Sequence, residues 1–370
     1  MNKNFVFAVS VLSKTIMGAG IFSLPLVFYM VGVGTGILYL LVFTLAYCVI
    51  HLMYAEAVRM EPDEHNFAYL ARKYLGSIFG SIATLIILIE LLIVLTVYII
   101  LSQSFFGIMF GVPGAYAAIL FWILGTAFIF VDLKWIEWIS VVSVLMLLTA
   151  VGIIFHTSIP YAFATPFVKP INWFLFLLPF GPLFFALNGR PAISKMVEVW
   201  RNATREKKPF SLTKAIVVGT LLPALLYIVF VLGVLKLSPI PSEDAISGIT
   251  AVLPAWLMAM LGAFGFVAIW VPYFMIGTNI RDILREDMHL SRIMSAGFVT
   301  LIPIGLFLFG VGQFISVVGF VGGLFLALEG VFVVTIWRRA FPRSKYRPVS
   351  YFLYAIFFLS IVYEILFIIF

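Results

Sequence analysis

Three ionisable side chains stand inside or beside the apolar segments of this chain, where a charge needs a physical reason. They are Lys14, Glu90 and Arg190. A charged group at the centre of a membrane-spanning helix costs about 2.5–3.5 kcal/mol, so such residues generally pair with one another or line a water-filled path. A buried lysine or glutamate can also exchange a proton. We therefore expect coupling or gating roles from these residues, and no catalytic residue.

Two clusters of glycine and proline interrupt apolar runs beside the lysine and the arginine. The first is SKTIMGAGIFSLP, from Ser13 to Pro25, and the second is PFGPLFFALNGRP, from Pro179 to Pro191. Glycine tolerates non-helical backbone angles, and proline lacks an amide donor and clashes with the preceding helical turn. Unpaired backbone at membrane depth is tolerated only where it lines a cavity or is buried in protein. We predict that the chain unwinds at Met17–Gly20 and at Ala186–Gly189.

The composition shows what kind of element must hold these groups. Hydrophobic residues make up 64% of the 370 residues and charged residues only 11%, in continuous apolar runs rather than alternating ones. This pattern predicts an all-α membrane protein and disfavours a β-barrel. The single cysteine, Cys48, cannot form an internal disulfide or a thiolate metal cluster, so we expect neither metal nor cofactor. The net charge is +7, and the lysines and arginines collect in a few loops. This pattern indicates membrane orientation rather than nucleic-acid binding.

Eleven transmembrane helices fit the apolar runs. They cover roughly Phe5–Met30, Thr35–Met60, Gly80–Phe110, Ala115–Val131, Ile136–Phe155, Trp173–Lys195, Leu212–Leu235, Ala255–Leu284, Ser295–Gly310, Ile315–Trp337 and Val349–Phe370. If the N-terminus is cytoplasmic, nearly all lysines and arginines fall in inside segments, and the outside segments keep only Lys169 and Lys236. The positive-inside rule then predicts a cytoplasmic N-terminus, an outside C-terminus and a multi-pass protein of the cell membrane.

The spans divide into two halves within one transmembrane domain, residues 1–370. The first repeat covers about 5–157, the second about 173–338, and an additional helix covers about 349–370. Because five spans is an odd number, the halves would insert in opposite orientations. Interrupted helices at matching positions of two inverted repeats point to a transport site, where amide groups bind a carboxylate and carbonyl groups bind an amine or cation. The simpler alternative is that the glycines only allow close packing and the prolines only kink the helices.

Three stretches carry a family resemblance that covers essentially the whole chain. TIMGAGIFSLPLVF resembles the first-helix signature of the amino acid/polyamine/organocation (APC) transporter superfamily, closest to its amino acid/auxin permease and aromatic amino acid permease branches. FGPLFFALNGRPAISKMVEVW resembles their sixth helix, and GTNIRDILRED resembles their eighth. The resemblance implies a LeuT-type 5+5 inverted repeat with broken helices 1 and 6, and alternating access.

The resemblance also implies where an amino acid would bind. The first break would contact the substrate carboxylate by main chain, and the second would face its amino group and side chain. A tyrosine in the third span would form an aromatic wall or gate, or would simply pack. The implied substrate-binding residues are Met17, Gly18, Ala19, Gly20, Ile21, Tyr98, Phe185, Ala186, Asn188 and Gly189.

Sodium dependence is doubtful on the same comparison. Sodium-coupled relatives carry hydroxyl side chains midway along the eighth helix, but the matching positions here are Val271 and Pro272. An ammonium group at Lys14 would fill the cation site, as a lysine does in some sodium-independent relatives. The alternative is that Lys14 extends its amine to the cytoplasmic interface, although it lies ~13 Å into the first span at 1.5 Å per residue.

The other two charges also have alternative roles. Glu90 would be a second protonation site, would pair with Lys14 or Arg190, or would be a neutral acid bonded to a neighbouring helix. Arg190 follows the second break directly, and a gate or structural role is favoured over binding a substrate carboxylate. Glu329, in the tenth span, is a weaker candidate.

The function predicted from the sequence is that of a secondary active permease. It would move a neutral or hydrophobic amino acid by alternating access, independently of sodium or coupled to protons. The expected partners are the amino acid substrate and the lipid bilayer, with no nucleic acid, and the oligomeric state stays open. The alternatives are an amino-acid sensor of the same fold or, less favoured, a membrane-embedded enzyme, for which no H-E-x-x-H, G-x-S-x-G or P-loop motif is present.

Overall fold

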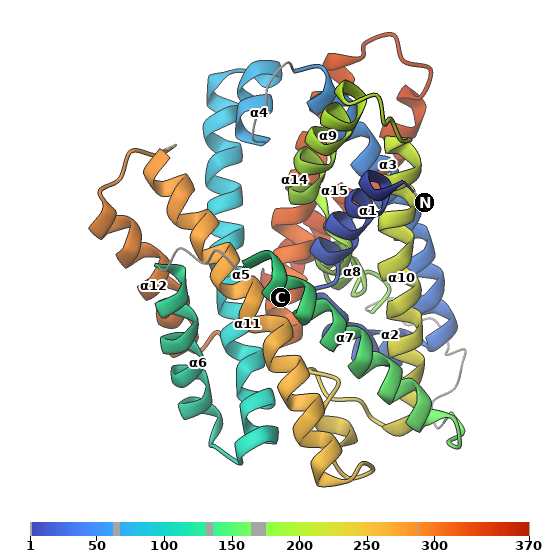
Figure 1. Cartoon of the computed structure of the whole chain (residues 1–370), viewed down its shortest axis with the longest axis vertical. Helices are drawn as coiled ribbons and strands as arrows, with labels where there is room; N and C mark the ends of the chain where they lie inside the picture. The colour runs from blue at the N-terminus through green and yellow to red at the C-terminus, as the bar shows by residue number, and fades with distance from the viewer. Residues whose placement is uncertain (1, 62–66, 131–135, 164–174, 287, 370) are drawn as a thin grey trace.

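The computed structural model describes residues 2–61, 67–130, 136–163, 175–286 and 288–369, and these form a bundle of helices (Figure 1). Long helices form because apolar runs with few charges satisfy every backbone hydrogen bond internally. The helices are α1 (Lys3–Ile16), α2 (Gly20–Val31), α3 (Val33–Arg59), α4 (Phe67–Leu75), α5 (Ser77–Phe110), α6 (Gly114–Ile129), α7 (Ile136–Ser158), α8 (Phe180–Leu187), α9 (Arg190–Arg205), α10 (Leu212–Leu237), η1 (Ser247–Ile249), α11 (Ala255–Glu286), α12 (Arg292–Leu308), α13 (Phe314–Phe320), η2 (Val321–Leu326), α14 (Ala327–Ala340) and α15 (Arg347–Ile369).

The helices account for the eleven predicted spans. In the described residues, seven helices are long and apolar enough to cross a membrane, one of them formed by α13, η2 and α14 together. The bent pair α1/α2 adds an eighth. The two shorter apolar helices, α6 and α12, and the broken pair α8/α9 supply the other three. The tenth span is continuous but contains one π-helical stretch, η2.

The start of the sixth span differs from the prediction. The span was expected from Trp173, which lies outside the described residues, whereas residues 175–179 form turns and helix α8 begins at Phe180. Pro179 is the residue before the first helical position, and Pro182 lies in the first turn, where its missing amide has no intrahelical acceptor in any case. These two prolines therefore begin the helix instead of interrupting it.

Sharp reversals between helices use glycine. Gly32 separates α2 from α3 with a φ of 94°, and Gly76 separates α4 from α5 with a φ of 105°. Both values lie in a region that residues with a Cβ rarely occupy. The two glycines let consecutive helices fold back against one another, so that α4 lies along the start of α5.

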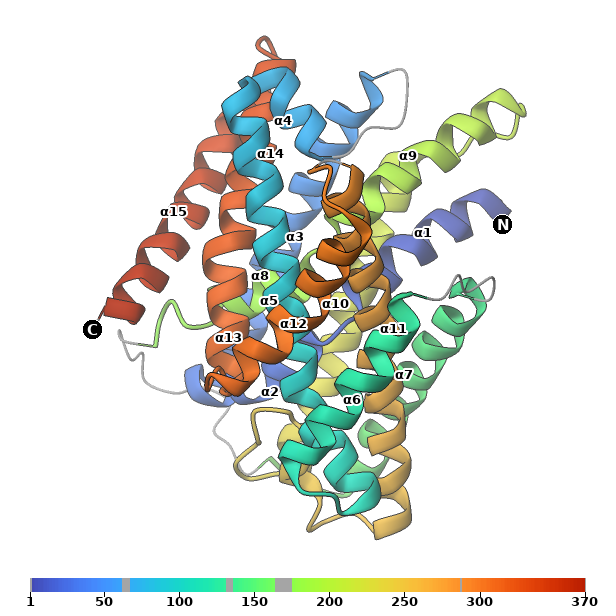
Figure 2. The same ribbon diagram turned by 90° about the vertical axis from the view of Figure 1, so that its left-hand side faces the viewer.

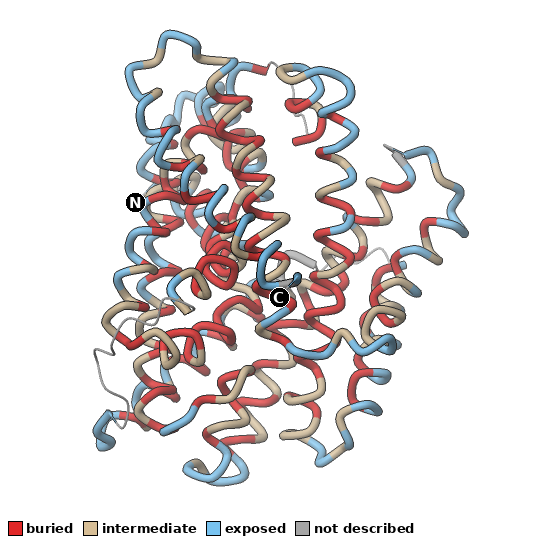
Figure 3. Tube along the Cα trace, turned by 180° about the vertical axis from the view of Figure 1, so that it is seen from behind, coloured by how far each residue is buried: buried red, intermediate tan, exposed pale blue. Residues whose placement is uncertain are grey.

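Burial follows the arrangement expected of a membrane bundle. Buried residues gather on the inner faces of the helices and exposed residues on the outer faces and ends (Figure 3). Outward-facing residues of α3 such as Leu38 and Leu45 are large and apolar, as contact with lipid tails requires. Helix α5 is the most buried of the seven long spans. Helices α1 and α9 run side by side and project sideways from the bundle, with the N-terminus at the free end of α1 (Figure 2).

Candidate functional site

The first predicted break is present. Helix α1 ends at Ile16, α2 begins at Gly20, and the two helices are bent by 59°. The amide of Gly18 turns back to donate to the carbonyl of Ile16 at 2.8 Å. Within the described residues, the amides of Ala19 and Gly20 donate to no acceptor, because they stand at the open N-terminal end of α2.

The second predicted break is also present, between α8 and α9. Asn188 is extended, with φ −66° and ψ 110°, and its side-chain oxygen accepts a hydrogen bond from the amide of Arg190 at 3.2 Å. The amide of Gly189 donates to Nε2 of His51 at 3.2 Å, while Nδ1 of the same ring lies 3.0 Å from the hydroxyl of Thr220. Because Nε2 accepts, we assign the ring as neutral, with its proton on Nδ1.

One tyrosine hydroxyl joins the two breaks. Tyr227 of α10 is fully buried, and its hydroxyl donates to the carbonyl of Ile16 at 2.6 Å and to that of Ala186 at 2.9 Å. These carbonyls lie in the last turns of α1 and α8, where main-chain acceptors lack intrahelical donors. A hydroxyl carries a single hydrogen, so the two carbonyls share one donor.

Close backbone contact holds the breaks together. A Cβ atom on Gly20 would lie 2.5 Å from Cα of Ala186, which is closer than any real contact of that kind. A Cβ on Gly18 would instead lie 3.9 Å from the hydroxyl of Tyr98, the third-span tyrosine. Gly20 is therefore required for the approach of the two breaks, whereas Gly18 leaves room beside Tyr98.

Helix α3 supplies polar partners along the sixth span. The hydroxyl of Tyr39 donates to the carbonyl of Phe176 and that of Tyr47 to the carbonyl of Phe184, both at 2.9 Å, and His51 holds the second break as described. The sequence reasoning missed these residues. The available signal was a set of tyrosine and histidine side chains at about four- and eight-residue spacing, which places them on one helical face.

A pocket of about 430 Å³ lies against both breaks. Helix α5 supplies Leu91, Val94 and Tyr98 to its wall, and α11 supplies Met275, Ile276 and Asn279, so its walls are mostly apolar. It extends along the end of α1 and the first turns of α9, toward the side of the molecule where the N-terminus lies. The pocket is therefore approached from that side.

The opposite side of the pocket is closed by aromatic rings. The ring of Phe22 packs edge-on against Phe105 at 5.1 Å and against Phe230 at 6.0 Å between centroids. All three are buried, and they come from α2, α5 and α10. Access to the breaks is thus asymmetric in this structure.

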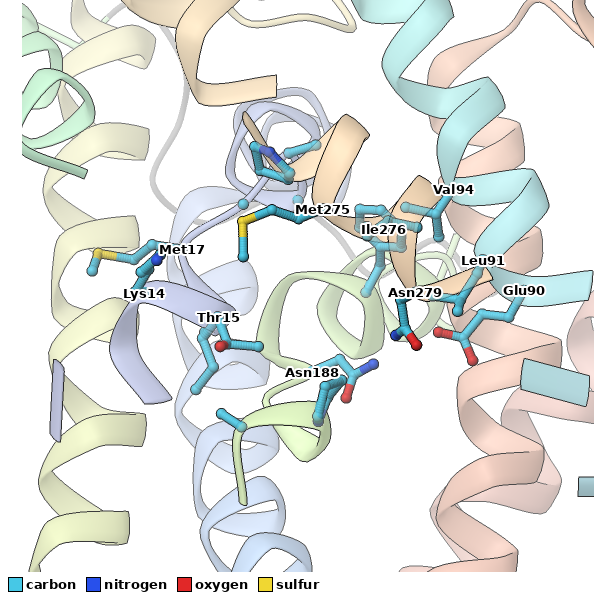
Figure 4. Close-up of a pocket in the computed structure, with 18 of the residues that line it drawn as sticks. Lys14, Thr15, Met17, Glu90, Leu91, Val94, Asn188, Met275, Ile276 and Asn279 are labelled. Atoms are coloured by element: carbon cyan, nitrogen blue, oxygen red, sulfur yellow. The ribbon is translucent and has the colours of Figure 1, made fainter. Parts of the chain in front are cut away.

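The predicted charges lie in three different places. Figure 4 shows Lys14 beside Met17 on one side of the pocket and Glu90 beside Asn279 on the other, so these two charges do not pair. Arg190 forms an ion pair with Glu329, with Nε and Oε1 at 2.5 Å, and its guanidinium lies 4.8 Å from the ring centre of Phe67. The arginine thus lies outside the pocket lining, which fits a structural or gating role.

The family model for the tryptophan/tyrosine permease family matches residues 1–367. The chain belongs to this family. The permease is similar in structure to MhsT in complex with L-phenylalanine, with a TM-score of 0.63 and 12% sequence identity over 99% of this chain and 97% of that one. It is also similar to the inward-facing conformation of Mhp1, with a TM-score of 0.60 and 13% identity over 97% and 89% of the two chains. No curated protein sequence matches significantly.

These comparisons confirm the LeuT-type fold and identify a multi-pass membrane transporter, which excludes the enzyme alternative. Among the predicted site residues of the permease, Lys14, Met17, Gly18, Ala19, Gly20, Glu90, Tyr98, Phe185 and Asn188 line the pocket. Ile21, Ala186 and Gly189 are buried beside it. The carbonyl of Ala186 already bonds to the side chain of Tyr227, and the amide of Gly189 already bonds to that of His51. The roles of all these residues in substrate binding stay predictions.

Proposed function

We propose that this permease moves a neutral amino acid with a large apolar or aromatic side chain, bound as a zwitterion between the two breaks. The observation that carries the proposal is the pair of amides at Ala19 and Gly20, which line the pocket and have no acceptor within the described residues. Amides at the start of a helix, together with the helix dipole, favour a carboxylate.

The remaining walls suit the other parts of such a substrate. The carbonyls of Ile16 and Ala186 are taken by Tyr227, so the ammonium group would use other main-chain oxygens of the breaks or the side chain of Asn188. An apolar side chain would pack against Val94, Ile276 and their neighbours. A pocket of about 430 Å³ is within the range that holds small organic ligands. The family description and the phenylalanine bound to MhsT support the aromatic class.

We also propose transport without sodium. The predicted hydroxyl positions of α11, Val271 and Pro272, carry no side-chain oxygen that could bind the ion. The amine of Lys14 is then the positive charge at the end of α1, where the helix dipole favours a cation. With the N-terminus in the cytoplasm of a cell-membrane protein, the pocket described above opens to the cytoplasm, and the Mhp1 structure that the permease resembles is also inward-facing.

Uptake by purified permease in liposomes tests the proposal. Labelled tryptophan, tyrosine and phenylalanine should enter saturably, each at the same rate in sodium buffer as in potassium buffer. Unlabelled glutamate and glycine should not compete with them. Tryptamine, which lacks the carboxylate, and N-acetyltryptophan, which lacks the ammonium charge, should fail as competitors. Competition by tryptamine equal to that by tryptophan would contradict the carboxylate site, and uptake only with sodium would contradict the Lys14 assignment.

A further inference from the structure

Two buried carboxyl groups lie near one arginine, whose side chain is 11% exposed, between α5, α9 and α14. Arg190 of α9 is paired with Glu329 of α14, and Glu90 of α5 interacts electrostatically with both. Glu90 and Glu329 are each only 4% exposed. One oxygen of each, Oε2, is buried and has no hydrogen-bond donor within the described residues.

The charges in this cluster do not balance if both acids are ionised. Two carboxylates and one guanidinium leave one uncompensated negative charge, which is costly in a water-poor interior. Arg190 cannot lose its proton, and it already contacts Glu329 directly. The acid that must be neutral in this arrangement is therefore Glu90, the one without a direct ionic partner.

Within the described residues, the other cations near the pocket are not partners of Glu90: Lys195 of α9 also lines the pocket, but its side chain is 55% exposed and forms an ion pair with Glu198. Tyr47 and Tyr54 face the cluster from α3, and tyrosine hydroxyls are neutral at physiological pH. From α11 comes Asn279, an uncharged amide, and α4 contributes the ring of Phe67 against Arg190. Lys14 lies across the pocket from Glu90 (Figure 4).

Glu90 is also the member of the cluster that reaches the pocket. It lines the pocket together with Leu91 and Asn279, whereas Arg190 and Glu329 do not. Its carboxyl group can thus exchange a proton with water in the pocket, while the ion pair lies outside the pocket lining.

We propose that Glu90 is the proton-binding site of this permease, with Arg190 as the charge that stabilises it after the proton leaves. This inference rests on the proposed amino acid transport and adds the coupling site. On release, the carboxyl O–H bond breaks, the proton passes to a pocket water, and the electron pair stays on the carboxylate, which then shares Arg190 with Glu329. Re-protonation from the opposite side, after the pocket has closed and reopened there, completes the cycle.

The test compares two activities of purified permease in liposomes. One is exchange of labelled for unlabelled amino acid without a pH gradient, and the other is accumulation driven by an inward proton gradient. Glu90→Gln should keep the exchange within about twofold but lose accumulation at least tenfold, together with the proton uptake that a trapped pH-sensitive dye reports. Glu364→Gln is the matched control, because Glu364 of α15 is equally buried but lies outside the cluster, and it should keep both activities.

Each outcome decides between the proposals. Accumulation by Glu90→Gln equal to that of the unaltered protein overturns the coupling site. Exchange by the unaltered protein without any proton-driven accumulation overturns it too, while leaving amino acid transport intact. No exchange by the unaltered protein refutes the transport proposal itself. If Glu90→Gln loses exchange as well, Glu90→Asp decides: restored accumulation supports a titrating carboxyl group, and an inactive variant overturns the proposal.

Discussion

At the scale of single residues, the site depends on side chains that complete broken backbone. Tyr227 and His51 are not expected to touch a substrate, yet they satisfy main-chain groups that both breaks leave open. A membrane interior offers no water for such groups, so each unmet one costs free energy. The polar residues with the largest structural effect here are therefore those that hold the unwound segments.

Removal of the Tyr227 hydroxyl tests this view. Tyr227→Phe leaves two buried carbonyls with one fewer donor, and such a loss costs about 1–3 kcal/mol. We expect a lower melting temperature in detergent and a lower maximal uptake rate. Tyr363→Phe is the control, because its hydroxyl makes no hydrogen bond within the described residues. Equal melting temperatures for the two variants would contradict the role of Tyr227.

Lys14 is the second residue-scale test. Lys14→Ala removes the positive charge from the last turn of α1, where it offsets the helix dipole beside the pocket. We expect uptake to fall at least tenfold in sodium-free buffer. The exposed Lys214→Ala should behave as the unaltered protein does. If Lys14→Ala matches the unaltered protein in rate and pH profile, Lys14 does not act as the internal cation.

At the scale of helices, the sequence predicted the breaks but not their surroundings. Glycine and proline are local signals, so the unwound segments 17–20 and 186–189 could be located from the chain alone. The contacts that complete them, such as Tyr227 with Ile16 or His51 with Gly189, join residues 138 to 211 positions apart. No local pattern encodes such pairing. For the same reason the role of Arg190 stayed open, and its ion pair with Glu329, a weaker candidate in the sequence, emerged only in three dimensions.

Close packing of α8 on the tenth span gives a prediction at this scale. A Cβ on Gly181 would lie 2.3 Å from the carbonyl oxygen of Gly319, and backbone atoms cannot move aside as a flexible side chain can. Gly181→Ala should therefore reduce the yield of folded protein, measured as the monodisperse fraction in gel filtration. Gly297→Ala should not, since a Cβ there meets nothing within 4 Å. Normal yield from Gly181→Ala would show that the two helices can separate without penalty.

At the scale of the whole molecule, access to the breaks is open on one side and closed on the other. The open side carries the projecting helices α1 and α9, and the closed side carries the packed rings around Phe22. The positive-inside rule, applied to the lysines and arginines of the loops, predicts that the open side faces the cytoplasm. The sequence could predict this orientation from charge, but not which side of the pocket is open, because that depends on packing between distant helices.

Thiol labelling checks access and orientation together. The only native cysteine, Cys48, is 7% exposed and should react slowly. Thr15→Cys, in the pocket wall, should react with a membrane-impermeant maleimide from the cytoplasmic face, and substrate should slow the reaction. Ile240→Cys, 70% exposed beyond the far end of α10, should react only from outside. The reverse pattern would invert the proposed orientation.

The hydroxyl of Tyr227 has one hydrogen and two carbonyl acceptors, those of Ile16 and Ala186. Should α1 swing away during transport, the hydrogen can settle fully on Ala186, and should α8 withdraw, it can settle on Ile16. In either case only one of the two hydrogen bonds is lost, because the tyrosine hydroxyl keeps the other carbonyl as its acceptor. A shared hydroxyl of this kind would let one broken helix move while the other keeps its hydrogen bond.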